Sequence, residues 1–523
     1  MFSLALAVFL ALVGLVFSTS ILQRRRRQIK LPPGPPRKPL VGNLGDLPSL
    51  DERTWEFWLK HKDIYGPISS LSVLGQTMIV LNDVQLATEL LDKRSAIHSC
   101  RPKFQFASMA GWDQILGVVE YSDRFRDLRR ALHQGIGSAK SISQYNSVQD
   151  VEVRRFLLRV LNDPECLINH LRKSTGAVAL QIAYGYTVEP HDSDPLVDLA
   201  ERAVHDFGLA VSPGTWIVDV FPLLRYLPTW FPGARFVRIA DRFQKTATAF
   251  CDAPCAFVKQ RLAQGDFRPS FLSNSLRNQE ESSETDESVL KWSAAAIYAG
   301  GADTTLSTLA TFFLAMTLYP EVQSKAQAEL QSVIGSDRLP GFQDRDNLPY
   351  INAIVKETLR WHPTVPVITH RSIGPDVCEG YDIPQGSWIM ANVWAMNHDP
   401  NSYIDPFSFK PERFLGYEGR SPEPDPHTFG FGRRICPGRN LARANIYLTV
   451  AQSLAVFQIS KPTQNGRESG LGPEFQAGFV SSPAPYDIDI RVRSPVYEKL
   501  IRTVETEYPW EKSHSKEINS LDS

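Results

Sequence analysis

The ten residues 429–438, FGFGRRICPG, present one cysteine, Cys436, just before a predicted helix. Gly432 and Gly438 allow a tight backbone that other segments can approach closely, and the largely apolar run 441–454 predicts the helix. Backbone N–H groups and the positive end of the helix dipole favour a thiolate over a thiol at such a position. A thiolate on heme iron favours cleavage of the O–O bond. The stretch therefore predicts a heme-thiolate centre built on Cys436.

A lone cysteine is most often an inert, buried residue that behaves as a small hydrophobe. The surroundings of Cys436 argue against that interpretation, because the segment matches the signature F-x-x-G-x-R-x-C-x-G position by position. The matching residues are Phe429, Gly432, Arg434, Cys436 and Gly438. With this motif the chain resembles the cytochrome P450 family. The resemblance implies a single-domain fold that is mainly α with a small β part, and heme b (iron protoporphyrin IX) with Cys436 as the axial ligand of the iron.

A second motif, GGADTT at residues 300–305, lies inside the predicted long helix 289–318. Two glycines in the middle of a helix destabilise the helix by about 2 kcal/mol relative to two alanines. These glycines should therefore have a role that offsets this loss of stability. Without side chains there, a flat cofactor could approach, and oxygen and water could enter a local distortion. The segment matches the family motif [AG]-G-x-[DE]-T-[ST], and the resemblance implies that Asp303 and Thr304 pass protons to the oxygen being reduced.

Simpler interpretations of these two residues stay open. A helical threonine commonly donates its hydroxyl hydrogen to the carbonyl four residues back. For Thr304 both roles can hold together, since that bond would itself open the helix groove. Asp303 could instead be a solvated surface charge.

Glu357 and Arg360 lie three residues apart on one predicted helix face, a spacing that alone is a weak signal. The segment 411–414, PERF, follows about fifty residues later and completes the family's pairing of E-x-x-R with P-E-R-F. By resemblance, Glu357, Arg360 and Arg413 form a buried cluster of ion pairs with a structural role.

Heme propionates need cations, and the arginine fork suits carboxylates. By resemblance, Arg434, Arg371 and Arg129 contact the propionates, and Phe429 is also a cofactor-binding residue. Each arginine could instead be a solvated surface charge. The family usually has tryptophan four residues before the position of Arg129, where this chain has Phe125, so heme contacts on that side are less well defined.

The N-terminal residues 1–22 carry no charge, and four arginines follow at 24–27. This length can cross the hydrocarbon core of a bilayer, and the arginines should stay cytoplasmic. A cleaved signal peptide would carry its positive charge before the apolar run, and a nuclear signal explains the arginines less simply. The prolines between residues 32 and 36 should form a stiff spacer.

The predicted organisation is a transmembrane anchor (1–22), a basic and Pro-rich hinge (23–36), a catalytic domain (37–500) and a polar C-terminal tail (501–523). A P-P-G-P hinge after an anchor resembles microsomal cytochromes P450, which implies a single-pass protein of the endoplasmic reticulum membrane with a cytoplasmic catalytic domain.

Length and composition argue against several domains, a nucleic-acid-binding surface, a disulfide framework and a zinc site. The length of 523 residues would allow three or four domains, but no composition break or internal repeat divides the chain. A net charge of -1 gives no basic surface for nucleic acid. Six cysteines without a C-x-x-C pair indicate neither a disulfide framework nor a zinc site.

Hydrophobic periodicity predicts few strands among many helices. Residues 68–81 should form a hairpin broken at Gly75-Gln76, and 387–393 and 487–492 should be strands. An acidic, serine-rich loop is expected at 280–288. After Ser494 the chain turns polar and is expected to fray.

The finer resemblance lies in KHKDIYGPISSLSVLGQTMIVLND, FASMAGW, AYGYTVEPH and LRYLPTWFPGA. These segments look like fungal cytochromes P450 of secondary metabolism, particularly the group around O-methylsterigmatocystin oxidoreductase. Resemblance places substrate contacts in residues 104–112, at Ile297 and Tyr298, in 365–369 and near Phe479. Their apolar character predicts a sizeable, hydrophobic substrate.

The resemblance implies a monooxygenase that takes electrons from NADPH through NADPH–cytochrome P450 reductase. Arg433, Arg439 and Arg443 flank the cysteine loop and could form a basic docking face for that reductase. Two alternatives stay open: an isomerase or dehydratase of the same fold that needs no reductase, and a non-enzymatic heme-binding protein. The Asp303-Thr304 pair argues against both.

Overall fold

The computed structural model describes residues 29–49, 51–282, 286–416, 421–464, 467–468 and 472–521. The predicted anchor, residues 1–22, and the first part of the hinge lie outside the described residues. Within the described ranges, no helix combines the length and the apolar character needed to span a bilayer.

Helices dominate the chain, in line with the predicted mainly α fold. The α-helices are α2 (Thr54–Tyr65), α3 (Val84–Ala87), α4 (Ser95–His98), α5 (Gln105–Met109), α6 (Asp123–Ile136), α7 (Ala139–Ser143), α8 (Asn146–Asn162), α9 (Leu167–Tyr184), α10 (Pro195–Ala210), α11 (Ile217–Val220), α12 (Arg235–Gln264), α13 (Phe271–Ser282), α14 (Glu287–Leu318), α15 (Pro320–Val333), α16 (Pro349–Trp361), α17 (Val393–Asn397), α18 (Asp425–Thr428), α19 (Arg439–Val456), α20 (Pro495–Glu507) and α21 (Ser515–Leu521). Short 3-10 or π turns are η1 (Leu44–Asp46), η2 (Thr88–Lys93), η3 (Pro164–Cys166), η4 (Pro222–Tyr226), η5 (Phe342–Asn347), η6 (Pro411–Phe414) and η7 (Gly432–Arg434).

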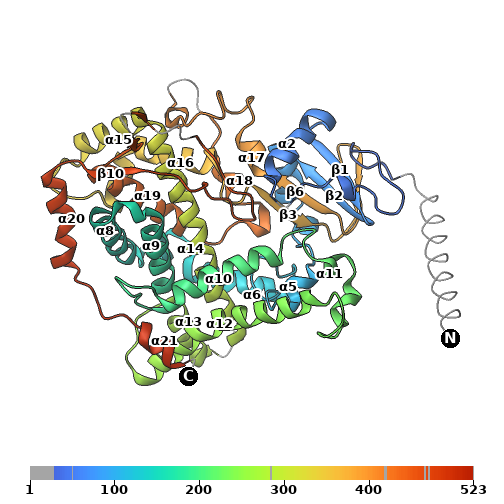
Figure 1. Ribbon diagram of the computed structural model, residues 1–523, viewed down its shortest axis with the longest axis horizontal. Coiled ribbons are helices and arrows are strands. Elements are labelled where there is room, and N and C mark those ends of the chain that lie inside the picture. Colours follow the sequence, from blue (N-terminus) through green and yellow to red (C-terminus); the bar gives the residue numbers. More distant parts are fainter. Residues whose placement is uncertain are drawn as a thin grey trace.

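The strands are short and lie mostly at one end of the molecule (Figure 1). They are β1 (Ile68–Val73), β2 (Gln76–Leu81), β3 (Val367–Arg371), β4 (Asp376–Cys378), β5 (Tyr381–Ile383), β6 (Trp388–Asn392), β7 (Phe457–Ser460), β8 (Thr463–Gln464), β9 (Arg467–Glu468) and β10 (Asp489–Val492). One sheet has the order β1-β2-β6-β3, with β2 parallel to β6 and the other pairs antiparallel. The predicted hairpin and the strands at β6 and β10 are confirmed.

The helix α14 runs through the middle of the molecule (Figure 1) and joins two hydrophobic cores. Asp286 caps its start by accepting from the backbone N–H of Ser288 at 2.9 Å. The first half of α14 packs with α6, α9, α10 and α12, and the second half with α8, α16 and α19. Residues 299–304, between the halves, are only partly covered, so the glycine motif lies where the two cores separate.

The Pro-rich segment packs against the sheet. The backbone N–H of Ser70 on β1 donates to Pro33 O at 2.8 Å, and its hydroxyl donates to Pro32 O at 2.6 Å. A Cβ built on Gly34 would lie 1.9 Å from Ser70 O, so only glycine fits there. Residues 32–36 are therefore docked on β1 and belong to the folded domain.

The expectation that the chain frays after Ser494 is wrong. Helix α20 buries Tyr497, Ile501 and Val504 in the second core, and α21 buries Ile518 in the first. These apolar residues recur every three or four positions within a polar sequence. The segment therefore folds as helix because its apolar residues recur at helical spacing, although it is polar on average.

Candidate functional site

The cysteine loop closes on itself just before α19. The backbone N–H of Cys436 donates to Phe429 O at 2.8 Å, and Gly438 is the residue that caps the helix. Gly432 has a φ of +48°, and a Cβ there would lie 2.4 Å from Leu91 O. Any larger residue at 432 would therefore push the loop away from its seat on η2. For Gly438 the nearest atom to a built Cβ is 3.9 Å away, so the described chain does not require glycine there.

Two opposing effects act on the Cys436 thiol. Burial is the larger and raises its pKa, while backbone N–H groups of Gly438 and Arg439 and the positive charges of Arg129 and Arg439 lower it. The predicted N–H donors at the helix start are present, but burial opposes their effect on the pKa. A metal ion that binds there must displace the proton, as cysteine ligation generally does.

The two glycines of α14 have different roles. A Cβ on Gly301 would touch Ala179 Cβ of α9 at 3.4 Å, so this glycine lies where α14 and α9 are in close contact. No heavy atom lies within 4 Å of a Cβ built on Gly300, so this side of the helix faces open space. The hydroxyl of Thr304 donates to Gly300 O at 2.5 Å. The predicted back-bond is confirmed, and it places the Thr304 hydroxyl at this open face.

Asp303 is half-buried beside the same segment. Burial raises its pKa, the nearby charge of Arg172 lowers it, and Glu201 raises it. Arg172 and Glu201 form an ion pair of 3.2 Å at the α9–α10 interface. A carboxyl group whose pKa is raised toward neutral pH exchanges its proton more readily near that pH than a fully solvated carboxylate does. The burial of Asp303 therefore favours the predicted proton relay over the alternative of a solvated surface charge.

Three arginines form a cluster of positive charge without a carboxylate. Arg101, Arg129 and Arg434 form no ion pair with any acid among the residues that the structure describes. The guanidinium of buried Arg434 donates only to backbone carbonyls, those of Ser99, Leu116 and Val119. Burial, followed by the charge of Arg101, lowers the pKa of Arg434 to about 9.

Arg101 is a second arginine whose positive charge has no acidic partner among the described residues. Burial lowers its pKa to about 10, and its Nε atom is buried without a hydrogen-bond partner in the described structure. Buried cations are normally paired with anions. Arg434 is buried and Arg101 and Arg129 are partly buried, so the cluster fits an anionic group that would compensate this charge.

The other two predicted cofactor residues, Arg371 and Phe429, are not part of this arginine cluster. Arg371 forms an ion pair with Glu120, so its charge is already compensated. Phe125, which replaces the usual tryptophan, lies with its ring centroid 3.9 Å from the Arg434 guanidinium carbon. Phe429 holds the cysteine loop through its carbonyl, and Arg443 lies over its ring at 5.1 Å. Heme contacts of Arg371 and of the Phe429 ring stay predictions.

The residues present fit a heme. Cys436 offers a sulfur ligand, Gly300 leaves room on one side of α14, and the arginine cluster has unmatched positive charge for two carboxylates. Arg101 was missed by sequence reasoning, because nothing in its local sequence distinguishes it from a surface arginine.

The predicted structural cluster is confirmed. Glu357 and Arg360 are fully buried and joined at 2.7 and 2.8 Å. Arg413 contacts the same carboxylate at 3.1 Å. The backbone N–H of Lys410 donates to it at 2.7 Å. This network ties α16 to η6 and the segment before it.

The predicted substrate-contacting residues divide into two groups. Ile297 and Tyr298 are buried in the first core, where the Tyr298 ring stacks on Phe250 of α12 at 4.9 Å and its hydroxyl donates to Leu196 O of α10. Phe479 is 48% exposed and meets Phe207 edge-on at 5.9 Å. Tyr298 therefore holds α10 and α12 on α14.

Comparison with known proteins agrees with the geometry. A family model described as Cytochrome P450 matches residues 32–490. The chain is 46% identical to "Cytochrome P450 monooxygenase ppsD" of Aspergillus oryzae, over 98% of this chain and 99% of that protein. It is 47% identical to "Cytochrome P450 monooxygenase claR" of Ampulloclitocybe clavipes, over 95% and 92%. It is 41% identical to "O-methylsterigmatocystin oxidoreductase" of Aspergillus flavus, over 97% and 96%.

Proposed function

Because the chain belongs to the cytochrome P450 family, we propose that it is a heme-thiolate monooxygenase that oxidises a hydrophobic natural-product intermediate in fungal secondary metabolism. The observation that carries the proposal is the conjunction of the Cys436 loop with the open face of α14, where Gly300, Asp303 and Thr304 lie. Electrons would come from NADPH through its reductase, and the second oxygen atom of O2 would leave as water.

Each residue of the site has a separate task. Heme, when bound, supplies the oxygen activation that a thiolate ligand promotes. Cys436 holds the cofactor, and Arg101, Arg129 and Arg434 would hold its carboxylates. The Thr304 hydroxyl can hold a water molecule at the open face of α14, while Asp303 can exchange protons with solvent beside the Arg172–Glu201 pair. The two residues together would deliver protons to the reacting oxygen.

The test of this proposal is NADPH-dependent O2 consumption by the protein reconstituted with a P450 reductase. A panel of hydrophobic fungal metabolites would serve as substrates, with oxygenated product measured in parallel. Product that forms without NADPH or O2 would support the isomerase or dehydratase alternative. Heme binding without turnover of any substrate would support the non-enzymatic alternative.

Replacing Thr304 with alanine is expected to lower the ratio of product to NADPH on the order of tenfold, because proton delivery loses its hydroxyl. Heme content and substrate affinity should change little, and the missing electrons should appear as hydrogen peroxide. Product, NADPH and peroxide are measured together.

Thr317→Ala is the matched control for this variant. Its hydroxyl makes the same back-bond, to Phe313 O at 2.8 Å, but it lies buried in the second half of α14. Coupling should stay unchanged in this control. Unchanged coupling in Thr304→Ala would reduce Thr304 to a structural helix residue.

Membrane attachment is also part of the proposal. The apolar residues 1–22 and the adjacent arginines support an anchor in the endoplasmic reticulum membrane. Phe221, Leu223 and Trp230, in the connection between α10 and α12, are 54%, 81% and 79% exposed. Such a patch suits contact with lipid. Arg433, Arg439 and Arg443 beside the cysteine loop are proposed to receive the reductase.

Deleting residues 1–22 is expected to release much of the protein from microsomes and to leave its heme spectrum intact. The deleted segment precedes the docked residues 32–36, and the two cores described above are formed by residues later in the chain. Sedimentation of microsomes and the CO difference spectrum measure the two effects. Residual binding should fall further in Trp230→Ala, and loss of heme from the soluble fraction would contradict the predicted boundary.

A further inference from the structure

The chain continues past the end of the family-model match at residue 490 and crosses the molecule. From α20 it runs along one side to α21, which lies beside α12 and α10 (Figure 1). Residues 508–521 are called the strap here. The strap contacts four separate parts of the fold.

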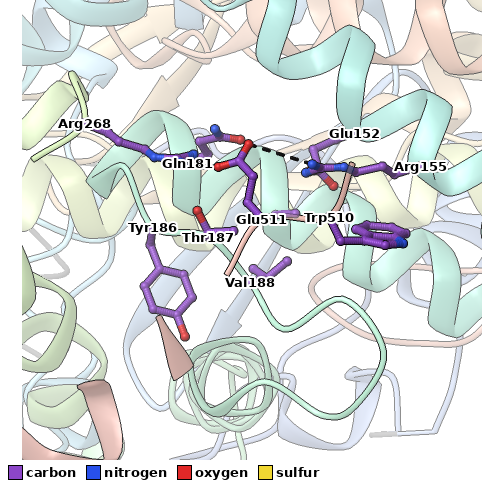
Figure 2. A pocket seen from close by; sticks show the side chains of 10 residues that line it. Glu152, Arg155, Gln181, Tyr186, Thr187, Val188, Arg268, Trp510 and Glu511 are labelled. Carbon is purple, nitrogen blue, oxygen red and sulfur yellow. Dashed lines mark hydrogen bonds and ion pairs between the residues drawn. The ribbon is translucent and has the colours of Figure 1, made fainter. Parts of the chain in front are cut away.

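The first contact is with α8. Trp510 lies under two arginine side chains of α8, at 5.0 Å from Arg155 and 5.3 Å from Arg159. Arg155 also donates to Pro509 O at 3.1 Å and pairs with Glu511 at 3.8 Å. Figure 2 shows the Trp510 ring beside Arg155 and the Glu511 carboxylate directed toward it. The cations on Trp510 are partly desolvated, which strengthens such contacts.

The second contact is with the connection between α9 and α10. The backbone of Thr187 forms a two-way bond with His514: Thr187 N–H donates to the imidazole Nδ1 at 2.9 Å, and His514 N–H donates to Thr187 O at 3.0 Å. Ser513 donates to the Glu189 carboxylate at 2.6 Å. The strap therefore fixes the chain that leads into α10.

The third and fourth contacts are with the end of α12 and the loop after it. Glu517 pairs with Arg261 of α12 at 2.8 Å, and the His514 ring lies 4.9 Å from the ring of Phe257. Glu511 also pairs with Arg268 of the loop. Ile518, 2% exposed, belongs to the core that α12 shares with α10.

Space remains on both sides of the strap. A cavity of about 10 Å³ separates Trp510 and Glu511 from Gln181 and Val188. A groove of about 400 Å³ lies between the strap and α12, lined by Phe257, Arg261 and His514 among others. Trp510 packs against the second core and Ile518 is buried in the first, so the strap is anchored to both cores and has open space beside it between these two points.

The helices that the strap holds pack on the first half of α14, beside the site. Tyr298, two residues before Gly300, is the point where α10 and α12 rest on α14. Glu201 of α10 pairs with Arg172 beside Asp303, so an outward movement of this helix pair would alter the surroundings of Asp303.

We propose that residues 508–521 act as a strap that ties α10 and α12 to α8 and restrains the outward movement of this helix pair beside the site. The restraint follows from the contacts described above, whereas its effect on access to heme rests on the proposed function.

The strap contains a group that titrates. The bond from Thr187 requires an unprotonated Nδ1 on His514. Burial and the charges of Arg261 and Arg268 lower the pKa of His514, while Glu517 and Asp266 raise it. Because the attached strap favours the neutral ring, its attachment is stable above the ordinary pKa of 6.5 and weakens as the pH falls below that value. His514→Asn keeps an acceptor for Thr187 and does not titrate.

The test is hydrogen exchange, followed by mass spectrometry, on the full-length heme-loaded protein. Trp510→Ala is expected to speed exchange in α10 and α12 about tenfold and to leave the second half of α14 unchanged. Tyr508→Ala, which removes a 40% exposed ring from the same segment, should have no effect. Between about pH 7.5 and 5.5, after correction for intrinsic rates, exchange in α12 should rise in the wild type and not in His514→Asn.

A second measurement uses 4-phenylimidazole, an azole that ligates heme iron. Its association rate should rise in Trp510→Ala if the helix pair opens more often. Unchanged exchange in α10 and α12, or an equal increase throughout the chain, would overturn the strap. Faster exchange without faster azole binding would overturn its control of access. A protein without heme would refute the proposed function and still allow the exchange test.

Discussion

Replacing Cys436 with serine is expected to abolish both monooxygenase turnover and the CO-bound absorption band of the reduced protein at about 450 nm, because only a thiolate ligand produces that band. The loop should still close, since the backbone bond from residue 436 to Phe429 O does not involve the side chain. The CO difference spectrum and the heme content together separate loss of the ligand from loss of the cofactor.

Cys378→Ser is the matched control, because Cys378 is also buried, at 2% exposure, but belongs to β4 and not to the loop. It should keep the band. Cys436→His offers a different ligand and should move the band to another wavelength. If Cys436→His retained both the original band and the activity, another residue would have to be the ligand.

Replacing Glu357 with glutamine is expected to destabilise the fold by about 3–5 kcal/mol, because it leaves the buried cations Arg360 and Arg413 without their anion. Glutamine has nearly the same shape, so the loss reports charge rather than packing. The free energy of unfolding in denaturant and the retention of heme during the titration measure the effect.

Glu498→Gln tests whether any glutamate–arginine pair would give this result. Glu498 contacts Arg502 at 3.0 Å on α20, but both side chains are more than 40% exposed. Its removal should change stability by only about 0.3–0.5 kcal/mol. Equal losses in the two variants would mean that burial of the Glu357 network contributes nothing.

The residues whose roles could be predicted are those that act through fixed local spacing. The cysteine loop, the GGADTT segment and the E-x-x-R pair each place their groups within one or two turns of backbone. The strands β1 and β2 could be predicted because apolar and polar residues alternate in them. The helix after Cys436 could be predicted because its apolar residues do not alternate. In each case the local sequence already contains the geometry.

The sequence could not predict in the same way which arginines have their charge compensated by an acidic side chain. Arg371 and Arg434 looked alike in the sequence, but Glu120, 251 positions away along the chain, neutralises Arg371. Arg434 is buried and Arg101 is half-buried, and neither pairs with an acid among the described residues. Whether an arginine is a solvated charge or part of an anion site depends on which distant segments enclose it.

The sequence by itself predicted the iron ligand, the proton-relay pair and the Glu357–Arg360 pair, because each prediction rests on residue types at fixed short separations. Only the tertiary structure decided that Tyr298 supports two helices and that the polar C-terminus is a folded strap. Those roles come from contacts such as Trp510 with Arg155 and His514 with Thr187, which join segments more than 300 positions apart. Their strength depends on burial and approach, and no local pattern encodes either.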